Sequence, residues 1–322
     1  MKFKSQTEPS EFIDALLDQL SWMYAVALPT HVVAAFHPFR SWYVWRNNQK
    51  MEKLLRPKIQ ERFAMKNLSS AKTVLEHIEP DSSNPKQLEA VSGHLKTMMA
   101  IGYDTTSSTM TYIFYCLSKN PTALRKVRLE LDEVLGTDLT KAANTIRESP
   151  KVLNEMPWVS AIIKETLRLY TPGGTVRQGI SGFDLVDAAG RLFPTEGCYV
   201  SDNPGVYHRD PQLWPRANEF LPERWLVAPG DELFPPAGAF RPFVAGPRNC
   251  IGQEFVQEEL KIFLALTARE FDVKACYDEW DQMHGISPDK FTDFMGDRGY
   301  QILGSCHLDS PRERLPCRIT VR

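Results

Sequence analysis

One cysteine in the sequence stands where a metal ligand or a nucleophile could be placed. Cys250 lies in the loop Phe243-Val-Ala-Gly-Pro-Arg-Asn-Cys-Ile-Gly252, which directly precedes a predicted helix. Free NH groups and the positive end of the helix dipole favour a thiolate at such a position. A lone cysteine could equally be a buried structural residue, so its neighbours must decide between the two interpretations.

The neighbours of Cys250 suit a flat cofactor with acidic edges. Gly246 and Gly252 carry no side chain where such a cofactor must approach the backbone. Arg248 supplies a guanidinium group suited to a carboxylate. A thiolate that ligates haem iron donates electron density to the metal and favours O–O cleavage. Haem is therefore one cofactor that the loop would fit.

A second group of polar residues interrupts an apolar helix. The run Gln87–Leu117 predicts a long buried helix that ends before Pro121. Gly102 and the polar residues 104–109 are poor choices for the interior of a helix. Either these hydroxyl groups hydrogen-bond their own helix carbonyls, or they serve a site beside the helix.

Two further segments carry charged residues at fixed spacing. Glu165 and Arg168 lie three residues apart on a predicted helix, so their side chains share a face and can pair. The segment Pro222-Glu-Arg-Trp225 follows in a proline-rich region. A Glu-x-x-Arg pair alone is a weak signal, because any solvated helix can carry one.

The elements around these residues predict a mainly α fold with small β-sheets (α+β). Segment 214–248 holds many prolines and little periodicity, so tertiary contacts must fix it. No linker separates the helical first half from the rest, so we expect a single domain over residues 1–322. Helices are predicted over 11–28, 36–65, 87–117, 121–135, 157–170 and 252–269, and strands over 271–275, 300–303 and 317–321.

The composition argues against several classes of protein. The chain carries 38 Lys and Arg against 40 Asp and Glu without a basic block, which argues against nucleic-acid binding. Its 6 cysteines have no paired spacing, which argues against a disulfide framework. The first ten residues do not predict a signal peptide, because no apolar core follows the lysines. The apolar stretch 23–36 is too short for a membrane-spanning helix, which needs about 20 apolar residues, and is expected to pack on the core.

The motifs, taken in order, resemble those of the cytochrome P-450 family. The cysteine loop matches the haem-binding pattern F-x-x-G-x-R-x-C-x-G at every fixed position. Glu165-Thr-Leu-Arg168 resembles the E-x-x-R motif, and Pro222–Trp225 resembles P-E-R-F with Trp in place of Phe. Ile101-Gly-Tyr-Asp-Thr-Thr106 resembles the A/G-G-x-D/E-T-T motif of the distal helix, with Ile in place of a small residue. The resemblance covers nearly the whole chain.

The resemblance implies a role for each of these segments in binding haem b (iron protoporphyrin IX). Cys250 would be the axial ligand of the haem iron, and Phe243 would shield its sulfur. Arg248 and Arg177 would each hold a haem propionate. The complete set of expected cofactor-binding residues is Arg177, Phe243, Gly246, Arg248, Cys250 and Gly252.

The resemblance also separates catalytic from structural residues. Asp104 and Thr105 would deliver protons during O2 activation. Glu165 would be clamped between Arg168 and Arg224 in a buried network that anchors the irregular segment leading to the cysteine.

The implied activity is that of a haem-thiolate monooxygenase acting on a small, mostly apolar organic substrate. Nothing in the chain resembles a flavin or nicotinamide site, so electrons would come from NADPH through a separate NADPH-cytochrome P450 reductase. The sequence of residues 239–254 looks most like that of fungal enzymes of secondary metabolism. The family resemblance places the protein on the cytoplasmic face of the endoplasmic reticulum.

Family members are considerably longer at the N-terminus, and this keeps two alternatives open. The membrane anchor, the first strands and the helix with a W-x-x-x-R motif are expected to be missing, since Trp42-x-x-x-Arg46 lies too close to the distal helix and is interpreted as a coincidence. The chain could then be a truncated, non-catalytic haem-binding protein. A thiolate-haem isomerase or dehydratase is the other alternative, and Asp104-Thr105 argues against it.

Overall fold

The computed structural model describes residues 11–27, 36–64, 74–79, 84, 86–286, 297–300 and 311–322. The described residues up to Asp104 belong to one compact unit (unit 1), and those from Thr105 onward belong to a second (unit 2). Both are mainly helical, and the strands described form small antiparallel pairs. The expected fold class is therefore confirmed, whereas the single-domain organisation stays a prediction.

Unit 1 is built from helices that bury one apolar stripe each. It comprises α1 (Glu11–Ala27), α3 (Arg40–Ala64), a 3-10 helix (Val74–His77) and the first part of α4 (Gln87–Lys119). Its core contains Phe12, Leu16, Leu20, Met51, Leu55, Ile59 and Val91. Glu52 on α3 accepts hydrogen bonds from the Ser92 hydroxyl at 2.6 Å and the Lys96 ammonium at 2.7 Å, which ties α3 to α4.

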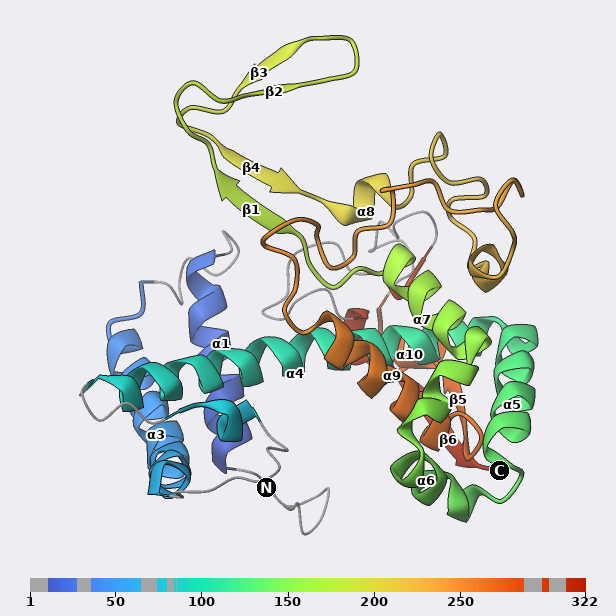
Figure 1. Cartoon of the computed structure of the whole chain (residues 1–322), viewed down its shortest axis with the longest axis horizontal. Coiled ribbons are helices and arrows are strands. Elements are labelled where there is room, and N and C mark those ends of the chain that lie inside the picture. Colours follow the sequence, from blue (N-terminus) through green and yellow to red (C-terminus); the bar gives the residue numbers. More distant parts are fainter. Residues whose placement is uncertain are drawn as a thin grey trace. The chain divides into compact units, whose positions relative to one another are not determined.

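Unit 2 has one large apolar core between five helices (Figure 1). The end of α4 packs with α5 (Pro121–Leu135), α6 (Leu139–Glu148), α7 (Pro157–Leu169) and α9 (Gln253–Thr267). Proline begins α5 and α7 at the position where its missing NH costs nothing. Gly136 follows α5 with φ +76°, a value that favours glycine, and so ends that helix.

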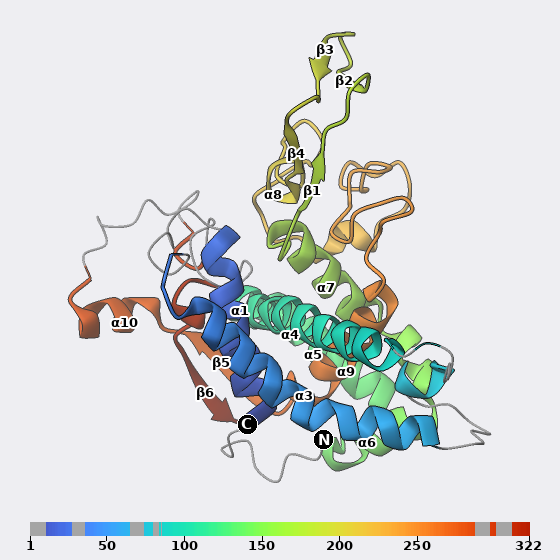
Figure 2. The ribbon, with the colours of Figure 1, turned by 90° about the vertical axis from the view of Figure 1, so that its left-hand side faces the viewer.

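The strands of unit 2 form three antiparallel pairs among the described residues. β1 (Thr175–Gln178) pairs with β4 (Tyr199–Asp202), and β2 (Asp184–Val186) pairs with β3 (Leu192–Pro194) to continue the same arm (Figure 2). β5 (Phe271–Ala275) pairs with β6 (Cys317–Val321) in register Phe271 to Val321. The predicted strands 271–275 and 317–321 are confirmed, while residues 301–303 of the third lie outside the described residues.

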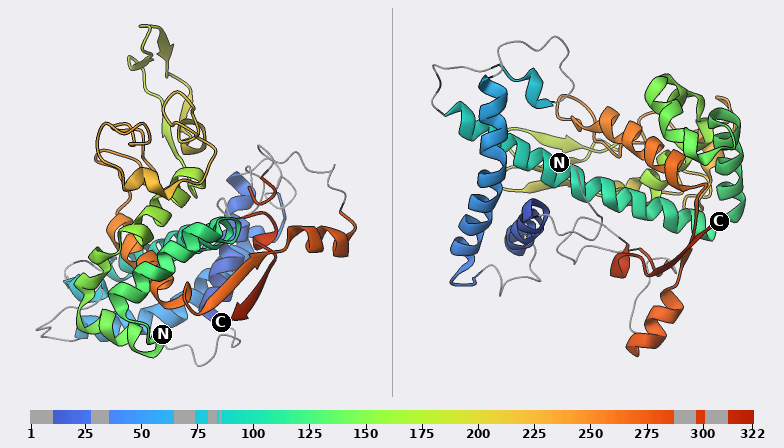
Figure 3. Two further views of the ribbon diagram at one scale, coloured as in Figure 1. Left: turned by 90° about the vertical axis from the view of Figure 1, so that its right-hand side faces the viewer. Right: turned by 90° about the horizontal axis from the view of Figure 1, so that it is seen from below.

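Some predicted elements differ from the structure. The helix expected over 36–65 begins at Arg40, because residues 36–39 form a turn. The helix expected to be buried over 87–117 is α4, but its first part is not buried: Met98, Ile101 and Tyr103 are 45%, 56% and 44% exposed. Three short helices were not predicted, namely α6, α8 (Pro204–Tyr207) and α10 (Tyr277–His284), the last of which follows β5 (Figure 3).

The proline-rich segment is irregular, as expected. Between α8 and α9 its only helical turn in the described structure is the 3-10 helix Pro222–Trp225. Among the helices that the structure describes, none has both the length and the apolar character needed to cross a bilayer. Most of the apolar stretch 23–36 lies outside the residues whose side chains are described.

Candidate functional site

The Cys250 loop folds back on itself before α9. The Cys250 NH donates a 2.9 Å hydrogen bond to the Phe243 carbonyl, and the Asn249 NH donates at 3.0 Å to the Gly246 carbonyl. Val244 and Gly246 turn the chain with φ values of 62° and +84°. Gly252 is the N-cap of α9. The structure thus places Cys250 three residues ahead of Gln253, the first residue of the helix.

The side chains of this loop leave the thiol accessible beside apolar surface. Cys250 is exposed, and so are Ile251 at 92% and Phe255 at 75%. Phe243 is half-buried and packs on the core of unit 2. Arg248 is exposed on the same loop. An accessible thiol, open apolar side chains and a neighbouring cation fit a flat apolar macrocycle with carboxylate edges.

Helix α4 approaches the same side of unit 2 as the Cys250 loop. The rings of Phe114 on α4 and Phe263 on α9 meet edge to face with centroids 5.5 Å apart. Both helices run from left to right in Figure 1, where α9 slopes away from α4, and in the right-hand view of Figure 3. Thr105 and Cys250 both precede that contact, so they lie on the same side of it.

The polar part of α4 is a regular helix. The helix continues without a break through Gly102, and no atom lies within 4 Å of where a Cβ on this residue would stand. Asp104 is buried at 5% exposure and Thr105 is half-buried. The hydroxyl of Thr109 donates to the Thr105 carbonyl at 2.8 Å. Bonding to the helix's own carbonyls, one of the two interpretations of this polar run, is therefore present at Thr109.

Arg177 lies on β1, and its side chain is exposed. Its guanidinium group donates to the hydroxyl of Thr175 and, at 3.1 Å, to the carbonyl of Val176. It is thus turned back onto its own strand, and its expected contact with a propionate stays a prediction.

The structure brings Glu165, Arg168 and Arg224 together with none of the three side chains exposed. Arg168 donates to both carboxylate oxygens of Glu165, from Nε at 3.0 Å and from Nη2 at 2.8 Å. Arg224 Nε donates to Oε1 at 3.1 Å. The bidentate geometry satisfies the carboxylate in a place that water does not reach.

The remaining donors of this network fix the irregular segment. Arg168 Nη1 donates to the carbonyls of His208 and Ala217, both at 2.7 Å, and Nη2 donates to that of Glu219 at 3.0 Å. Arg224 Nη2 donates to the Pro215 carbonyl at 3.2 Å. The two arginines therefore hold a stretch of chain that lacks regular backbone hydrogen bonds of its own.

His208 links this network to the cysteine loop. Its Nε2 accepts a 3.0 Å hydrogen bond from the NH of Arg241, two residues before Phe243. Because Nε2 accepts, Nδ1 carries the proton and lies 3.0 Å from the Thr171 hydroxyl. Burial, and next the charges of Arg168 and Arg241, lower the pKa of His208 to about 3, so the ring is neutral.

Sequence reasoning missed two members of this assembly. Trp225 Nε1 donates to Glu165 Oε2 at 3.0 Å, so the Trp that replaces Phe in the motif adds a hydrogen-bond donor. The signal for it was the departure from the motif itself. His208 gave no such signal, because no local pattern shows that its ring is buried against Phe240, with centroids 5.6 Å apart.

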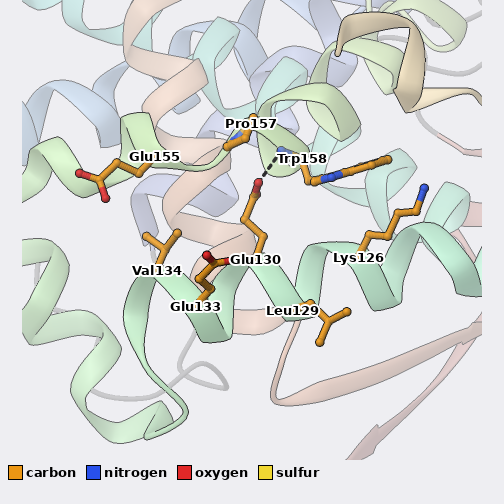
Figure 4. A pocket seen from close by; sticks show the side chains of 8 residues that line it. All are labelled: Lys126, Leu129, Glu130, Glu133, Val134, Glu155, Pro157 and Trp158. Atoms are coloured by element: carbon orange, nitrogen blue, oxygen red, sulfur yellow. Dashed lines mark hydrogen bonds between the residues drawn. The ribbon is translucent and has the colours of Figure 1, made fainter. Parts of the chain in front are cut away.

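A separate groove of about 720 Å³ lies between α5 and the start of α7 (Figure 4). Glu130 points from α5 to the α7 N-terminus and accepts hydrogen bonds from the NH groups of Trp158 at 2.7 Å and Val159 at 2.9 Å. The ammonium of Lys126 lies over the Trp158 ring, 4.2 Å from its centroid. These contacts cap a helix and join it to its neighbour, so we assign the groove a structural role.

The segment Trp42-x-x-x-Arg46 has a local role in the structure. The Arg46 guanidinium lies 5.2 Å from the centroids of the Trp42 and Tyr43 rings, and it pairs with Asp18 at 3.3 Å. All of these contacts join α3 to itself or to α1 in unit 1.

Comparison with known proteins gives consistent matches. A family model for cytochrome P450 matches residues 2–291. The cytochrome P450 monooxygenase polC of Polytolypa hystricis is 36% identical over 333 residues, covering 99% of this chain and 59% of that protein. The cytochrome P450 monooxygenase acrF of Aspergillus aculeatus is 35% identical over 234 residues, covering 66% of this chain and 47% of that protein. The chain thus spans less than two thirds of the length of these relatives.

A solved structure, that of the retinoic acid bound cyanobacterial CYP120A1, matches with a TM-score of 0.71 at 20% identity. The match covers 98% of this chain and 64% of that chain. At this level of identity the likeness shows a shared fold.

The buried network predicts a large effect of removing one charge. Glu165→Gln would leave Arg168 and Arg224 buried without a carboxylate, and we expect a loss of about 3–5 kcal/mol in the free energy of unfolding. Urea unfolding followed by circular dichroism measures this loss. Glu219→Gln, which removes an exposed partner of Arg216, is the matched control and should change stability little. An equal, small effect of both variants would contradict the assigned role of the network.

The neutral His208 predicts a pH dependence of stability. Its pKa is lowered to about 3 in the folded chain from 6.5 in the unfolded chain. Between these values the unfolded chain binds a proton that the folded chain does not, so stability falls as the pH is lowered. We expect a loss of about 2 kcal/mol from pH 7 to pH 5, measured by urea unfolding. His208→Gln should show a shallower loss, and an unchanged slope would rule out His208 as its source.

Proposed function

The chain belongs to the cytochrome P450 family, and from that membership we propose that it forms the haem-binding part of a haem-thiolate monooxygenase. The family implies haem iron as the cofactor, and we propose haem b with Cys250 as the axial ligand. The observation that carries this proposal is the accessible Cys250 thiol, held at the start of α9 by the hydrogen bond from its NH to Phe243 and surrounded by exposed apolar side chains.

The loop residues would divide the work of holding the cofactor. Cys250, as thiolate, would bind the iron, and the N-terminus of α9 would stabilise its charge. Arg248 would pair with one propionate, and Arg177 would turn from its own strand to pair with another. Phe243 would exclude water from the sulfur, while Gly246 and Gly252 would let the cofactor lie close to the backbone.

The polar residues of α4 would handle protons. Bound haem supplies the redox chemistry that activates O2 and oxidises an organic substrate. Asp104, buried on α4, would take up protons from solvent. The Thr105 hydroxyl would then hold each proton and donate it to the reacting oxygen. Thr105 and Cys250 lie on the same side of the α4–α9 contact, which supports this division of roles.

We propose a small, mostly apolar organic substrate and, from the two fungal relatives, a role in fungal secondary metabolism. Electrons would come from NADPH through a separate NADPH-cytochrome P450 reductase. The family resemblance favours the cytoplasmic face of the endoplasmic reticulum as the location.

The ligand assignment predicts the spectrum of the reduced protein with carbon monoxide. The haem-loaded chain should give the absorption band of a thiolate-ligated haem, and Cys250→Ala should lose it because no sulfur then binds the iron. Cys198→Ala, which removes another exposed thiol, should keep the band. A thiolate band that remains in Cys250→Ala would contradict the assignment of Cys250 as the axial ligand. A band without any turnover in the presence of reductase would instead favour the non-catalytic alternative.

The proton assignment predicts uncoupling in Thr105→Ala. Without the hydroxyl, protons reach the reacting oxygen poorly, so O2 should leave as peroxide instead of forming product. The ratio of peroxide to NADPH consumed measures this effect, with haem content unchanged. Thr111→Ala is the matched control, because the Thr111 hydroxyl donates to the Ser107 carbonyl at 2.7 Å on the same helix. Full coupling in Thr105→Ala would show that the hydroxyl at this position is not needed.

A further inference from the structure

Four buried tyrosines form a connected cluster in unit 2 (the tyrosine cluster: Tyr112, Tyr115, Tyr170 and Tyr277). The rings of Tyr112 and Tyr170 are stacked with centroids 4.3 Å apart. The Tyr115 ring lies 6.1 Å from both Tyr170 and Tyr277. None of the four is more than 7% exposed. Rings this close and this well shielded from water can exchange an electron through direct contact.

Two phenols of the cluster share one carboxylate. Tyr115 donates its hydroxyl hydrogen bond to Oδ1 of Asp297, and Tyr170 donates to Oδ2. The Tyr115 oxygen in turn accepts from the Lys119 ammonium at 3.1 Å and from the Gly299 NH at 3.2 Å. Burial foremost, with Asp297 adding to it, raises the pKa of both phenols, so both remain neutral donors.

This arrangement suits one-electron oxidation of a phenol. A phenol that loses an electron becomes a strong acid, so its oxidation is easy only where a base can take the proton at once. Asp297 is a hydrogen-bonded acceptor for two phenols. The Lys119 ammonium lies 3.7 Å from Oδ1 of the same carboxylate.

We propose that Tyr115 and Tyr170, with Asp297 as the proton acceptor, form a redox-active pair that returns electrons to the haem when it has been oxidised without substrate. This inference rests on the proposed function, because the oxidised haem is the electron acceptor. Tyr112 connects the pair to the proposed site, since it follows Thr105 by seven residues. It therefore lies two turns further on the same face of α4, a rise of about 10 Å.

The step balances with hydrogen peroxide as the oxidant and a thiol or the reductase as the later source of an electron. One electron passes from the phenol of Tyr115 or Tyr170, through Tyr112, to a haem oxidised by hydrogen peroxide. The phenolic O–H bond breaks and an O–H bond forms on Asp297, leaving a neutral phenoxyl radical and a haem reduced by one electron. A thiol reductant or the reductase later supplies an electron, and Asp297 returns the proton. The oxidising equivalent thus leaves the haem before it attacks the protein near the iron.

Electron paramagnetic resonance tests the radical directly. Haem-loaded protein is mixed with hydrogen peroxide without substrate and frozen rapidly, and we expect a tyrosyl signal. The double variant Tyr115→Phe/Tyr170→Phe should lose it, and Asp297→Asn should weaken it because the amide cannot take the proton. Tyr199→Phe, at a residue that is 78% exposed, is the control and should keep the signal. An undiminished signal in the double variant would overturn the proposal.

A second measurement separates failure of this inference from failure of the proposed function. A photogenerated ruthenium(III) polypyridyl complex oxidises the chain whether or not haem is bound, and phenoxyl absorbance is followed after the flash. We expect less phenoxyl in the double variant than in wild type, and a slowing in D2O that Asp297→Asn removes. Equal yields and equal D2O effects in all variants would overturn the redox role even if haem binding is normal. The far-ultraviolet circular dichroism of each variant reports whether it is folded.

Discussion

The carboxylate of Glu165 is the group on which the arrangement of unit 2 depends. It accepts hydrogen bonds from two arginines, one tryptophan and the NH of Leu221, and it is shielded from water completely. A carboxylate in this position destabilises the folded chain unless all of its partners are in place. Its partners come from α7 and from the irregular segment. The irregular segment therefore has one position in which the Glu165 carboxylate keeps all of its hydrogen bonds. This links an otherwise unstructured stretch to a helix of the core.

The effect of this anchor extends to the cysteine loop through His208. Arg168 holds the His208 carbonyl, and the ring of the same residue holds the NH of Arg241. Phe240 packs on His208 and on Trp225, whose ring centroid lies 4.5 Å away. The loop that presents Cys250 is therefore held at its first end by the network and at its second end by α9. A thiol whose loop is held at both ends has little freedom to change its position.

The sequence predicted those elements whose formation depends on local signals. Proline at the start of α5 and α7 and the periodic apolar residues of α9 placed these helices within two residues, and β-branched and aromatic residues placed β5 and β6. The residues of the network were predicted through their motifs, as were those of the cysteine loop. His208 and Asp297 were not, because their roles depend on partners 33 or more positions away. The exposure of α4 near Ile101 also escaped prediction, since an apolar pattern does not tell which apolar face remains uncovered.

The hydrogen bonds that Arg168 donates to the irregular segment all go to main-chain oxygens, those of His208, Ala217 and Glu219. Carbonyl groups are the same for every amino acid, so these three hydrogen bonds do not depend on the side chains of the residues that accept them. Positions of that stretch whose side chains take no part in the network can therefore change while the chain keeps its path. Protein engineers could use the same freedom to change these positions without disturbing the Cys250 loop.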